Sequence, residues 1–248
     1  MNLGLEGRVA LVAGASKGLG HAIAKALAAE GVSVAITARD RDRAIAAASA
    51  FGGVGFVHDS GDLESVSALV AEVEDRLGQI DILVTNSGGP PGGDPFSFSR
   101  AQWQESYESL VLGPLALVEA VLPGMRKRHW GRILNIGSTA VREPIPTLIL
   151  SNVHRAGAVT AFKTISGRVA GDGVTLNTLL PGRIATDRLY ELYGSRHAAD
   201  EVARNEIPAR RLGSPEEFAA AAAFLCSSHA GYITGTTLTV DGGMTHAA

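Results

Sequence analysis

The chain alternates short apolar runs with longer stretches in which apolar residues recur every three or four positions. The short runs are bounded by glycine or polar residues and predict buried parallel strands, whereas the longer periodic stretches predict helices. Strands are expected at 9–13, 32–37, 54–57, 80–85, 132–137, 174–180 and 236–240. Helices are expected at 21–30, 41–50, 62–77, 99–127 and 151–170, and from 214 onward.

Several local signals support these helices. Asp62 is expected to cap the helix that ends at Leu77, and both Ser99 with Gln102 and the segment 214–217 (SPEE) resemble capping boxes. Pro114 lies within a predicted helix and should bend it. The segment 88–94 (GGPPGGD) is too rich in glycine and proline to be regular.

Strands and helices alternate along the chain without a repeat or a linker. This order predicts an α/β fold that forms a single domain over residues 1–248. The expected architecture is a doubly wound Rossmann-type domain, a seven-stranded parallel sheet with helices on both faces. A ligand would then bind at the carboxyl ends of the strands.

Composition and charge narrow the class of protein. The formal net charge of −3 gives no basic patch, so we expect no nucleic acid partner. The single cysteine, Cys226, lies in an apolar helical run and is expected to be buried, which suits a reducing compartment. The start of the chain shows no secretory signal, and no apolar run approaches membrane-spanning length. We therefore expect a cytoplasmic protein without a membrane partner, and no metal site.

Residues 8–20 (RVALVAGASKGLG) carry the most specific chemical signal. They place Gly14, Gly18 and Gly20 between the first predicted strand and the helix that follows. Glycine permits a tight turn and close ligand approach, and the N–H groups of a helix start favour a diphosphate. The pattern therefore favours a dinucleotide site over an ordinary glycine-rich turn.

The end of the second predicted strand bears on which dinucleotide binds. An acid at this place accepts a bond from the ribose 2′-hydroxyl, whereas an arginine accommodates a 2′-phosphate. Here Ala38 occupies the expected position of the acid, Arg39 follows it, and Lys17 in the glycine turn adds a second cation. We predict NADP(H) in preference to NAD(H). Asp40 would serve as the ribose acceptor if the turn were shifted by two residues.

Further motifs recur in a fixed order along the chain. They are 14–20 (GASKGLG), Asp59, 85–88 (TNSG), 137–138 (GS), Asn177, 181–182 (PG), 211–215 (RLGSP), 232–235 (YITG) and 241–243 (DGG). In this order they resemble the short-chain dehydrogenase/reductase family over essentially the full chain, near its 3-oxoacyl-(acyl-carrier-protein) reductases.

The resemblance implies an NADP(H) site in which Asp59 lies against the adenine, Asn86 and Gly88 line the cofactor, and Ile184 and Thr186 hold the nicotinamide amide. The implied cofactor-binding set is Gly14, Ser16, Lys17, Gly18, Leu19, Gly20, Arg39, Asp59, Ser60, Asn86, Ser87, Gly88, Arg155, Pro181, Gly182, Ile184 and Thr186. It also implies a helical lid at about 187–206, a loop at 88–95 that walls the cleft, and a homotetramer built partly from the helices near 100–127 and 151–170.

The catalytic residues depart from the family. Ser138 stands where a serine polarises the substrate carbonyl, but Ser151 occupies the place of the proton-transferring tyrosine and Arg155 that of its lysine. Leu110 replaces the family's asparagine. A serine has no accessible ionisation, and an arginine stays protonated, although its donors can still bind ribose hydroxyls. His154 is a candidate for the missing proton donor, because it titrates near neutrality and lies three residues after Ser151.

Two functions therefore compete. One is an NADP(H)-dependent oxidoreductase that acts on a small-molecule carbonyl or alcohol through a divergent proton-transfer site. The other is a catalytically silent NADP(H)-binding homologue that acts as a sensor or an oligomer subunit. A dehydratase or isomerase is a third, weaker candidate. Three lid arginines, Arg188, Arg196 and Arg204, are expected to be solvated rather than to bind an acidic substrate.

Overall fold

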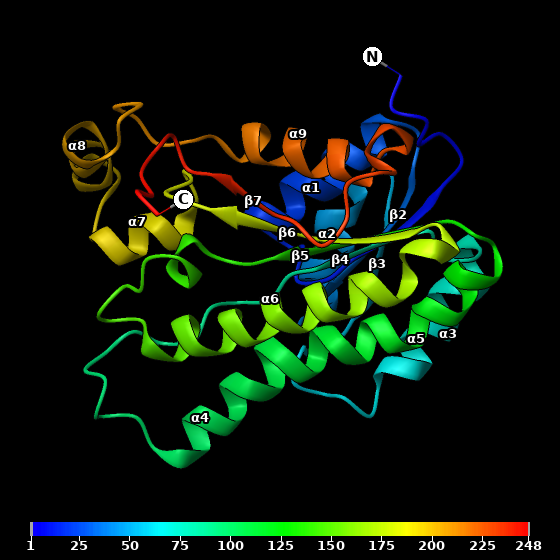
Figure 1. Cartoon of the computed structure of the whole chain (residues 1–248), viewed down its shortest axis with the longest axis horizontal. Coiled ribbons are helices and arrows are strands. Elements are labelled where there is room, and N and C mark those ends of the chain that lie inside the picture. Colours follow the sequence, from blue (N-terminus) through cyan, green and yellow to red (C-terminus); the bar gives the residue numbers. More distant parts are fainter. Residues whose placement is uncertain (1, 248) are drawn as a thin grey trace.

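The computed structural model describes residues 2–247 and places seven parallel strands in one sheet, in the order β3-β2-β1-β4-β5-β6-β7 (Figure 1). The strands are β1 (Val9–Val12), β2 (Ser33–Ala38), β3 (Val54–Val57), β4 (Ile82–Thr85), β5 (Gly131–Ile136), β6 (Val174–Pro181) and β7 (Thr237–Val240). Each begins and ends within two residues of its expected position, so the predicted doubly wound fold is confirmed. The order reverses between β1 and β4, where such sheets bind ligands.

Helices cover both faces of the sheet, as expected (Figure 1). One face packs against α1 (Gly18–Ala29), α2 (Arg41–Ser49) and α9 (Pro215–Cys226), and the other against α3 (Val66–Leu77), α5 (Gly113–Lys127) and α6 (Ile149–Val169). Successive strand residues point to opposite faces. Ala10 and Val12 therefore join the first layer, while Val9 and Leu11 join the second.

The capping signals have mixed outcomes. Capping boxes at Ser99 and Ser214 are present and begin α4 (Arg100–Tyr107) and α9. The expected start of α3 at Asp62 is wrong, because the helix begins at Val66. The Asp62 carboxylate instead accepts a hydrogen bond from the Ser65 backbone N–H at 3.2 Å, which closes a turn before the helix.

The predicted helix at 99–127 is divided by a π-helical turn, η1 (Glu108–Leu112), after which α5 begins with Pro114 in its first turn. Proline is tolerated there because the first N–H groups of a helix need no partner. Contrary to expectation, Arg100–Lys127 is long and apolar enough to cross a membrane, since an 18-residue window reaches a mean hydropathy of 1.4. Its residues Leu117, Val121 and Met125 pack in the core below the sheet, as in the core helix of a soluble protein.

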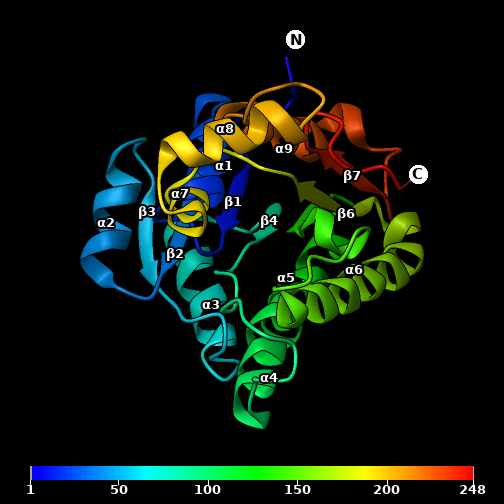
Figure 2. The ribbon, with the colours of Figure 1, turned by 90° about the vertical axis from the view of Figure 1, so that its left-hand side faces the viewer.

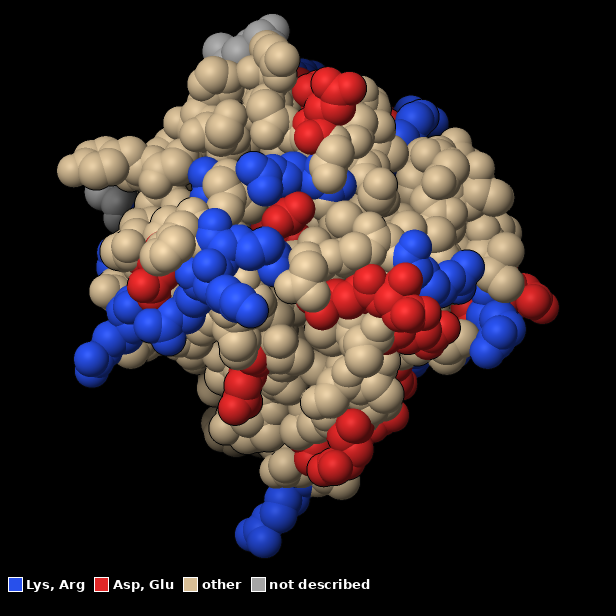
Figure 3. All heavy atoms as spheres, turned by 90° about the vertical axis from the view of Figure 1, so that its right-hand side faces the viewer, with Lys and Arg blue, Asp and Glu red and all other residues tan. Residues whose placement is uncertain are grey.

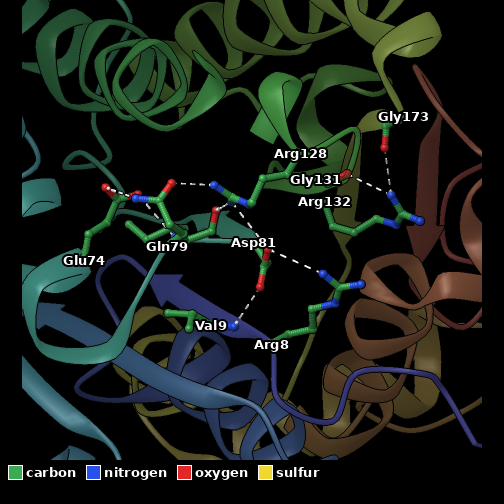
Figure 4. A network of polar contacts seen from close by, with 10 residues as sticks. Arg8, Val9, Glu74, Gln79, Asp81, Arg128, Gly131, Arg132 and Gly173 are labelled. Carbon is green, nitrogen blue, oxygen red and sulfur yellow. Dashed lines mark hydrogen bonds and ion pairs between the residues drawn. The ribbon is translucent and has the colours of Figure 1, made fainter. Parts of the chain in front are cut away.

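The amino ends of the strands are joined by charged groups (Figure 4). The Asp81 carboxylate lies 3.6 Å from the Arg8 guanidinium and 3.4 Å from that of Arg128, and it accepts a bond from the Val9 N–H. On this face of the molecule, clusters of Lys and Arg lie beside clusters of Asp and Glu (Figure 3). Nearby, Cys226 is buried as predicted, and burial raises the pKa of its thiol to about 12.

The expected lid at 187–206 forms two helices rather than one, α7 (Asp187–Tyr193) and α8 (Arg196–Glu206). Gly194, with a φ of 76°, ends the first helix in the left-handed conformation that favours glycine. Ala199, Ala203 and Ile207 form a small apolar cluster of their own beside the main core. The two helices lie at the carboxyl ends of the strands (Figures 1 and 2).

Candidate functional site

A cavity of about 770 Å³ opens at the carboxyl ends of the strands. Its walls come from the residues that follow β1, β2, β3, β4, β5 and β6, and from α4, α6 and α7. The loop that runs from Asn86 to Pro91 forms one wall, as predicted for the glycine- and proline-rich segment. The volume is in the range of small-molecule and cofactor sites.

The glycine turn is held against β4 by close backbone contacts. Gly14 has a φ of 56°, and a Cβ there would lie 2.7 Å from the Asn86 carbonyl oxygen. The Asn86 side-chain amide donates to the Gly14 carbonyl at 2.9 Å, and the Gly14 N–H donates to the Thr37 hydroxyl at 3.1 Å. The turn is therefore fixed from both neighbouring strands before any ligand binds.

Sixteen of the seventeen predicted cofactor-binding residues line this cavity. They are Gly14, Ser16, Lys17, Gly18, Leu19, Arg39, Asp59, Ser60, Asn86, Ser87, Gly88, Arg155, Pro181, Gly182, Ile184 and Thr186. Gly20 does not line it. A Cβ at Gly20 would lie 2.9 Å from the Gly14 carbonyl, so this glycine permits α1 to pack closely on the turn.

The residues near the ends of β2 and β3 distinguish between two predictions, Arg39 with Lys17 at a 2′-phosphate and Asp40 at a ribose hydroxyl. Arg39 and Lys17 both line the cavity, whereas Asp40 does not. The Asp40 carboxylate caps α2 by accepting a bond from the Arg43 N–H at 2.9 Å. Asp59 also lines the cavity, with one oxygen held by the Gly61 N–H at 3.0 Å. This end therefore presents two cations and the Asp59 carboxylate.

The opposite end of the cavity contains three of the four predicted catalytic residues. Ser138 follows β5, and its hydroxyl oxygen accepts a bond from the Ala140 N–H at 3.1 Å, which leaves its proton free to be donated. Ser151 and Arg155 lie one helical turn apart on α6 and both line the cavity. The Arg155 guanidinium donates to the Ile136 carbonyl at 2.7 Å. No tyrosine is found among the cavity-lining residues in the described part of the chain.

His154 is not brought to the cavity. Its ring is buried between α6 and α4, where it packs against Trp103 at a centroid distance of 5.4 Å and against Tyr107 at 6.1 Å. Burial lowers the pKa of His154, which favours the neutral ring at pH 7. Its three-residue offset from Ser151 turns it toward the neighbouring helix, so we do not retain it as a proton donor.

Other cavity residues were not expected from the sequence. Arg188 is exposed, as expected, but it also lines the cavity, and one guanidinium nitrogen donates to the Pro90 carbonyl at 3.3 Å. Glu105 and Glu108 line the wall formed by α4 and η1. Glu105 and Glu108 are three residues apart in the helical run that begins after Ser99. This spacing was the one signal that could have placed them on a common face. Within residues 2–247 no group of His, Cys, Asp or Glu side chains is arranged to hold a metal ion.

Comparisons with known proteins agree with this architecture. Residues 14–245 match the family described as enoyl-(acyl carrier protein) reductase. The 3-oxoacyl-(acyl-carrier-protein) reductase FabG of Vibrio cholerae is 38% identical over 244 residues, covering 98% of this chain and 99% of that protein. FabG of Escherichia coli is 35% identical over the same coverage of both chains.

Solved structures of related proteins have a similar fold. The L-sorbose reductase of Gluconobacter frateurii, complexed with NADPH and L-sorbose, superposes with a TM-score of 0.92 at 33% identity over the whole of both chains. YwfH, an NADPH-dependent reductase involved in bacilysin biosynthesis, has a TM-score of 0.92 at 29% identity, covering 97% of this chain and 99% of its own. The sequence and structural matches span nearly the whole chain, and it therefore belongs to the short-chain dehydrogenase/reductase family.

Proposed function

We propose that this protein is an NADP(H)-dependent oxidoreductase that reduces a small carbonyl compound, or oxidises the corresponding alcohol, without a tyrosine as proton donor. The observation that carries the proposal is one cavity that the glycine turn, two cations and Ser138 all line. YwfH, which is named as an NADPH-dependent reductase, and the L-sorbose reductase solved with NADPH support the choice of cofactor.

The residues present fit a phosphorylated dinucleotide. The first turn of α1 offers backbone N–H groups to a diphosphate, and Gly18 leaves open space because a Cβ there would meet only Thr186, at 3.9 Å. Arg39 and Lys17 can bind a 2′-phosphate, and the free donors of Arg155 can bind ribose hydroxyls. When bound, the cofactor supplies hydride to, or accepts it from, the reacting carbon.

In this mechanism the side chains of the chain position the substrate. Ser138 donates its hydroxyl proton in a hydrogen bond to the carbonyl oxygen and so stabilises the charge that develops there. Ser151 is shorter than the tyrosine of the family, so we propose that a water from solvent, rather than a side chain, supplies the proton and that the hydroxide formed returns to solvent. Arg155 remains protonated and acts through its charge rather than by proton transfer.

Binding and turnover test this function. We expect calorimetry of the purified chain to detect NADPH binding, and NADPH absorbance to fall when a panel of aldehydes, ketones and oxo acids is added. Binding without turnover on any member of the panel would instead support the silent homologue. Failure to bind either reduced coenzyme would contradict both functions.

Charge at Arg39 should decide the choice of coenzyme. Because Arg39→Asp removes a cation from the cavity and adds an anion that can accept a bond from a ribose hydroxyl, we expect NADPH affinity to fall by about tenfold and NADH affinity to rise. The measurement is calorimetric titration of both coenzymes. Arg41→Asp makes the same charge change on a neighbouring residue that does not line the cavity, and it should leave the preference unchanged. An equal shift in the two variants would show a general effect of net charge.

Gly14 tests whether the turn needs its close contact with β4. In Gly14→Ala the new Cβ would displace the Asn86 carbonyl, so we expect NADPH affinity to fall by about tenfold. Gly7→Ala is the matched control, since Gly7 has a φ of 75° but no atom within 4 Å of its Cβ position. It should show the backbone cost of about 1 kcal/mol in urea unfolding with no change in affinity. Unchanged affinity in Gly14→Ala would contradict this account of the turn.

The resemblance to the family also bears on where the protein is found in the cell and on its oligomeric state. We propose a cytoplasmic homotetramer built partly from α4, α5 and α6. Exposed apolar side chains on these helices, Tyr107 at 40% and Val153 at 48%, support such an interface. Light scattering of the purified chain measures the assembly directly.

A further inference from the structure

Two arginines from different elements face the reactive end of the cavity. Arg155 comes from α6, and Arg188 is the second residue of α7, yet both line the same space. Each is anchored by one backbone carbonyl, that of Ile136 for Arg155 and that of Pro90 for Arg188. Arg188 also fills the space that a side chain at Gly89 would need. Both guanidinium groups are thus held in place by the loops around them.

Among the residues that the structure describes, the guanidinium groups of Arg155 and Arg188 form no ion pair with a carboxylate. In the described part of the chain, no carboxylate oxygen lies within 4.0 Å of either guanidinium. Four acidic residues line the cavity, Asp59, Glu105, Glu108 and Asp187, but all stay beyond that distance. Burial, and secondly the charge of Arg188, lower the pKa of Arg155 to about 10. Arg155 is still protonated at pH 7, so the two cations repel one another across the cavity.

Ser138 and Ser151 complete this end of the cavity. The free proton of Ser138 can be donated to a carbonyl oxygen. In residues 2–247 the Ser151 hydroxyl makes no hydrogen bond, although the residue is only 8% exposed. A half-buried cation and a free hydroxyl one helical turn apart on α6 favour an anionic group that accepts from both.

We propose that Arg188, together with the Arg155 donors that the ribose leaves free, binds a carboxylate of the substrate, so that the protein acts on a small carbonyl compound that carries an acid group. The carboxylate lies where the tyrosine ring of the family would stand, and the neighbouring carbonyl oxygen accepts from Ser138. This inference rests on the proposed oxidoreductase function for its reaction but not for its binding step. Arg188 is exposed, as expected, and the proposal adds a binding role to that exposed residue.

Paired probes test the inference. The protein saturated with NADP⁺ is titrated by calorimetry with benzoylformate and its methyl ester, and with pyruvate and its methyl ester. Oxidised coenzyme cannot reduce these compounds, so the titration reports binding alone. We expect at least one acid to bind about tenfold more tightly than its ester, because the ester lacks the charge that the arginines recognise. Equal affinities of acid and ester, or no binding of either acid, would overturn the proposal.

Variants assign the effect to Arg188. Arg188→Gln should abolish the preference for the acid while changing the affinity for NADP⁺ by less than about twofold. Arg196→Gln is the control, because it removes the same charge from an exposed lid residue outside the cavity. If Arg188→Gln weakened NADP⁺ binding and left the acid preference intact, Arg188 would serve the cofactor diphosphate and the proposal would fail.

The titration is repeated on the protein without coenzyme, so that the two proposals can fail separately. Absence of NADP⁺ binding would contradict the oxidoreductase function. A preference for the acid that depends on Arg188 in the same free protein would still support the anion site. If the protein showed no preference for the acid over its ester, the proposed anion site would be contradicted even if NADP⁺ bound normally.

Discussion

The double substitution Ser151→Tyr with Arg155→Lys is expected to raise NADPH-dependent reduction of a neutral ketone by about 10²–10⁴-fold, the usual contribution of general acid catalysis. Both residues line the cavity from one face of α6, a turn apart. A phenol with an ordinary pKa of about 10 would point at the space beside Ser138, and the lysine charge would lower that pKa toward working pH. The measurement is the initial rate of NADPH oxidation at saturating ketone.

A second double variant, Ser151→Phe with Arg155→Lys, controls for volume. It places the same ring beside Ser138 without the hydroxyl, so we expect no gain in rate. A comparable gain in both variants would mean that packing, rather than proton donation, limits the natural chain. No gain in the tyrosine variant, with NADPH affinity retained, would contradict the placement of Ser151 at the proton-transfer position.

The tyrosine variant also bears on the proposed anion site. Its ring would fill the space beside Arg155 in which we place the substrate carboxylate. The same change that accelerates neutral ketones should therefore weaken benzoylformate binding. These two positions together then switch the cavity between two substrate classes, because a phenol and a carboxylate compete for one volume.

Much of the fold could be predicted because it depends on local patterns. Short apolar runs bounded by glycine or polar residues predicted the strands, and a fully buried strand such as β4 shows no alternation of polar residues that could be misread. The capping boxes at Ser99 and Ser214 placed two helix starts correctly, because serine and glutamine or glutamate three residues apart satisfy each other's backbone. The glycine turn predicted one part of the cavity wall for the same local reason, and the family resemblance supplied most of the other residues that line it.

The errors arise where distant segments decide the outcome. Asp62 is a good helix cap by residue type, but it closes a turn on Ser65 instead. His154 faces α4 rather than the cavity, since Trp103 and Tyr107 offer it an aromatic pocket that a single helix cannot reveal. Arg188 is exposed as expected, but its place in the cavity wall was missed, because its partner, the Pro90 carbonyl, comes from a loop almost a hundred residues earlier. None of these contacts leaves a periodic signal in the sequence.

Removing the hydroxyl of Ser138 is expected to lower the turnover of any substrate by about 10²–10³-fold, the cost of losing one donor to a developing oxyanion. In Ser138→Ala the carbonyl oxygen loses the donor that lies at the end of β5. Affinity for NADPH should stay unchanged, because the loss falls on the transition state rather than on the cofactor. The measurement is kcat from NADPH oxidation, with calorimetric NADPH affinity on the same preparation.

The Ser138 hydroxyl also accepts a bond from the Ala140 N–H, so part of any effect could come from lost stability. Ser214→Ala separates the two contributions, because the Ser214 hydroxyl accepts from the Glu217 N–H at the same 3.1 Å and lies outside the cavity. Each variant should lose about 1 kcal/mol of unfolding free energy in urea. Only Ser138→Ala should lose turnover. If both variants slowed equally, the hydroxyl at 138 would stabilise the chain without acting on the substrate, and the proposed reaction would need another donor.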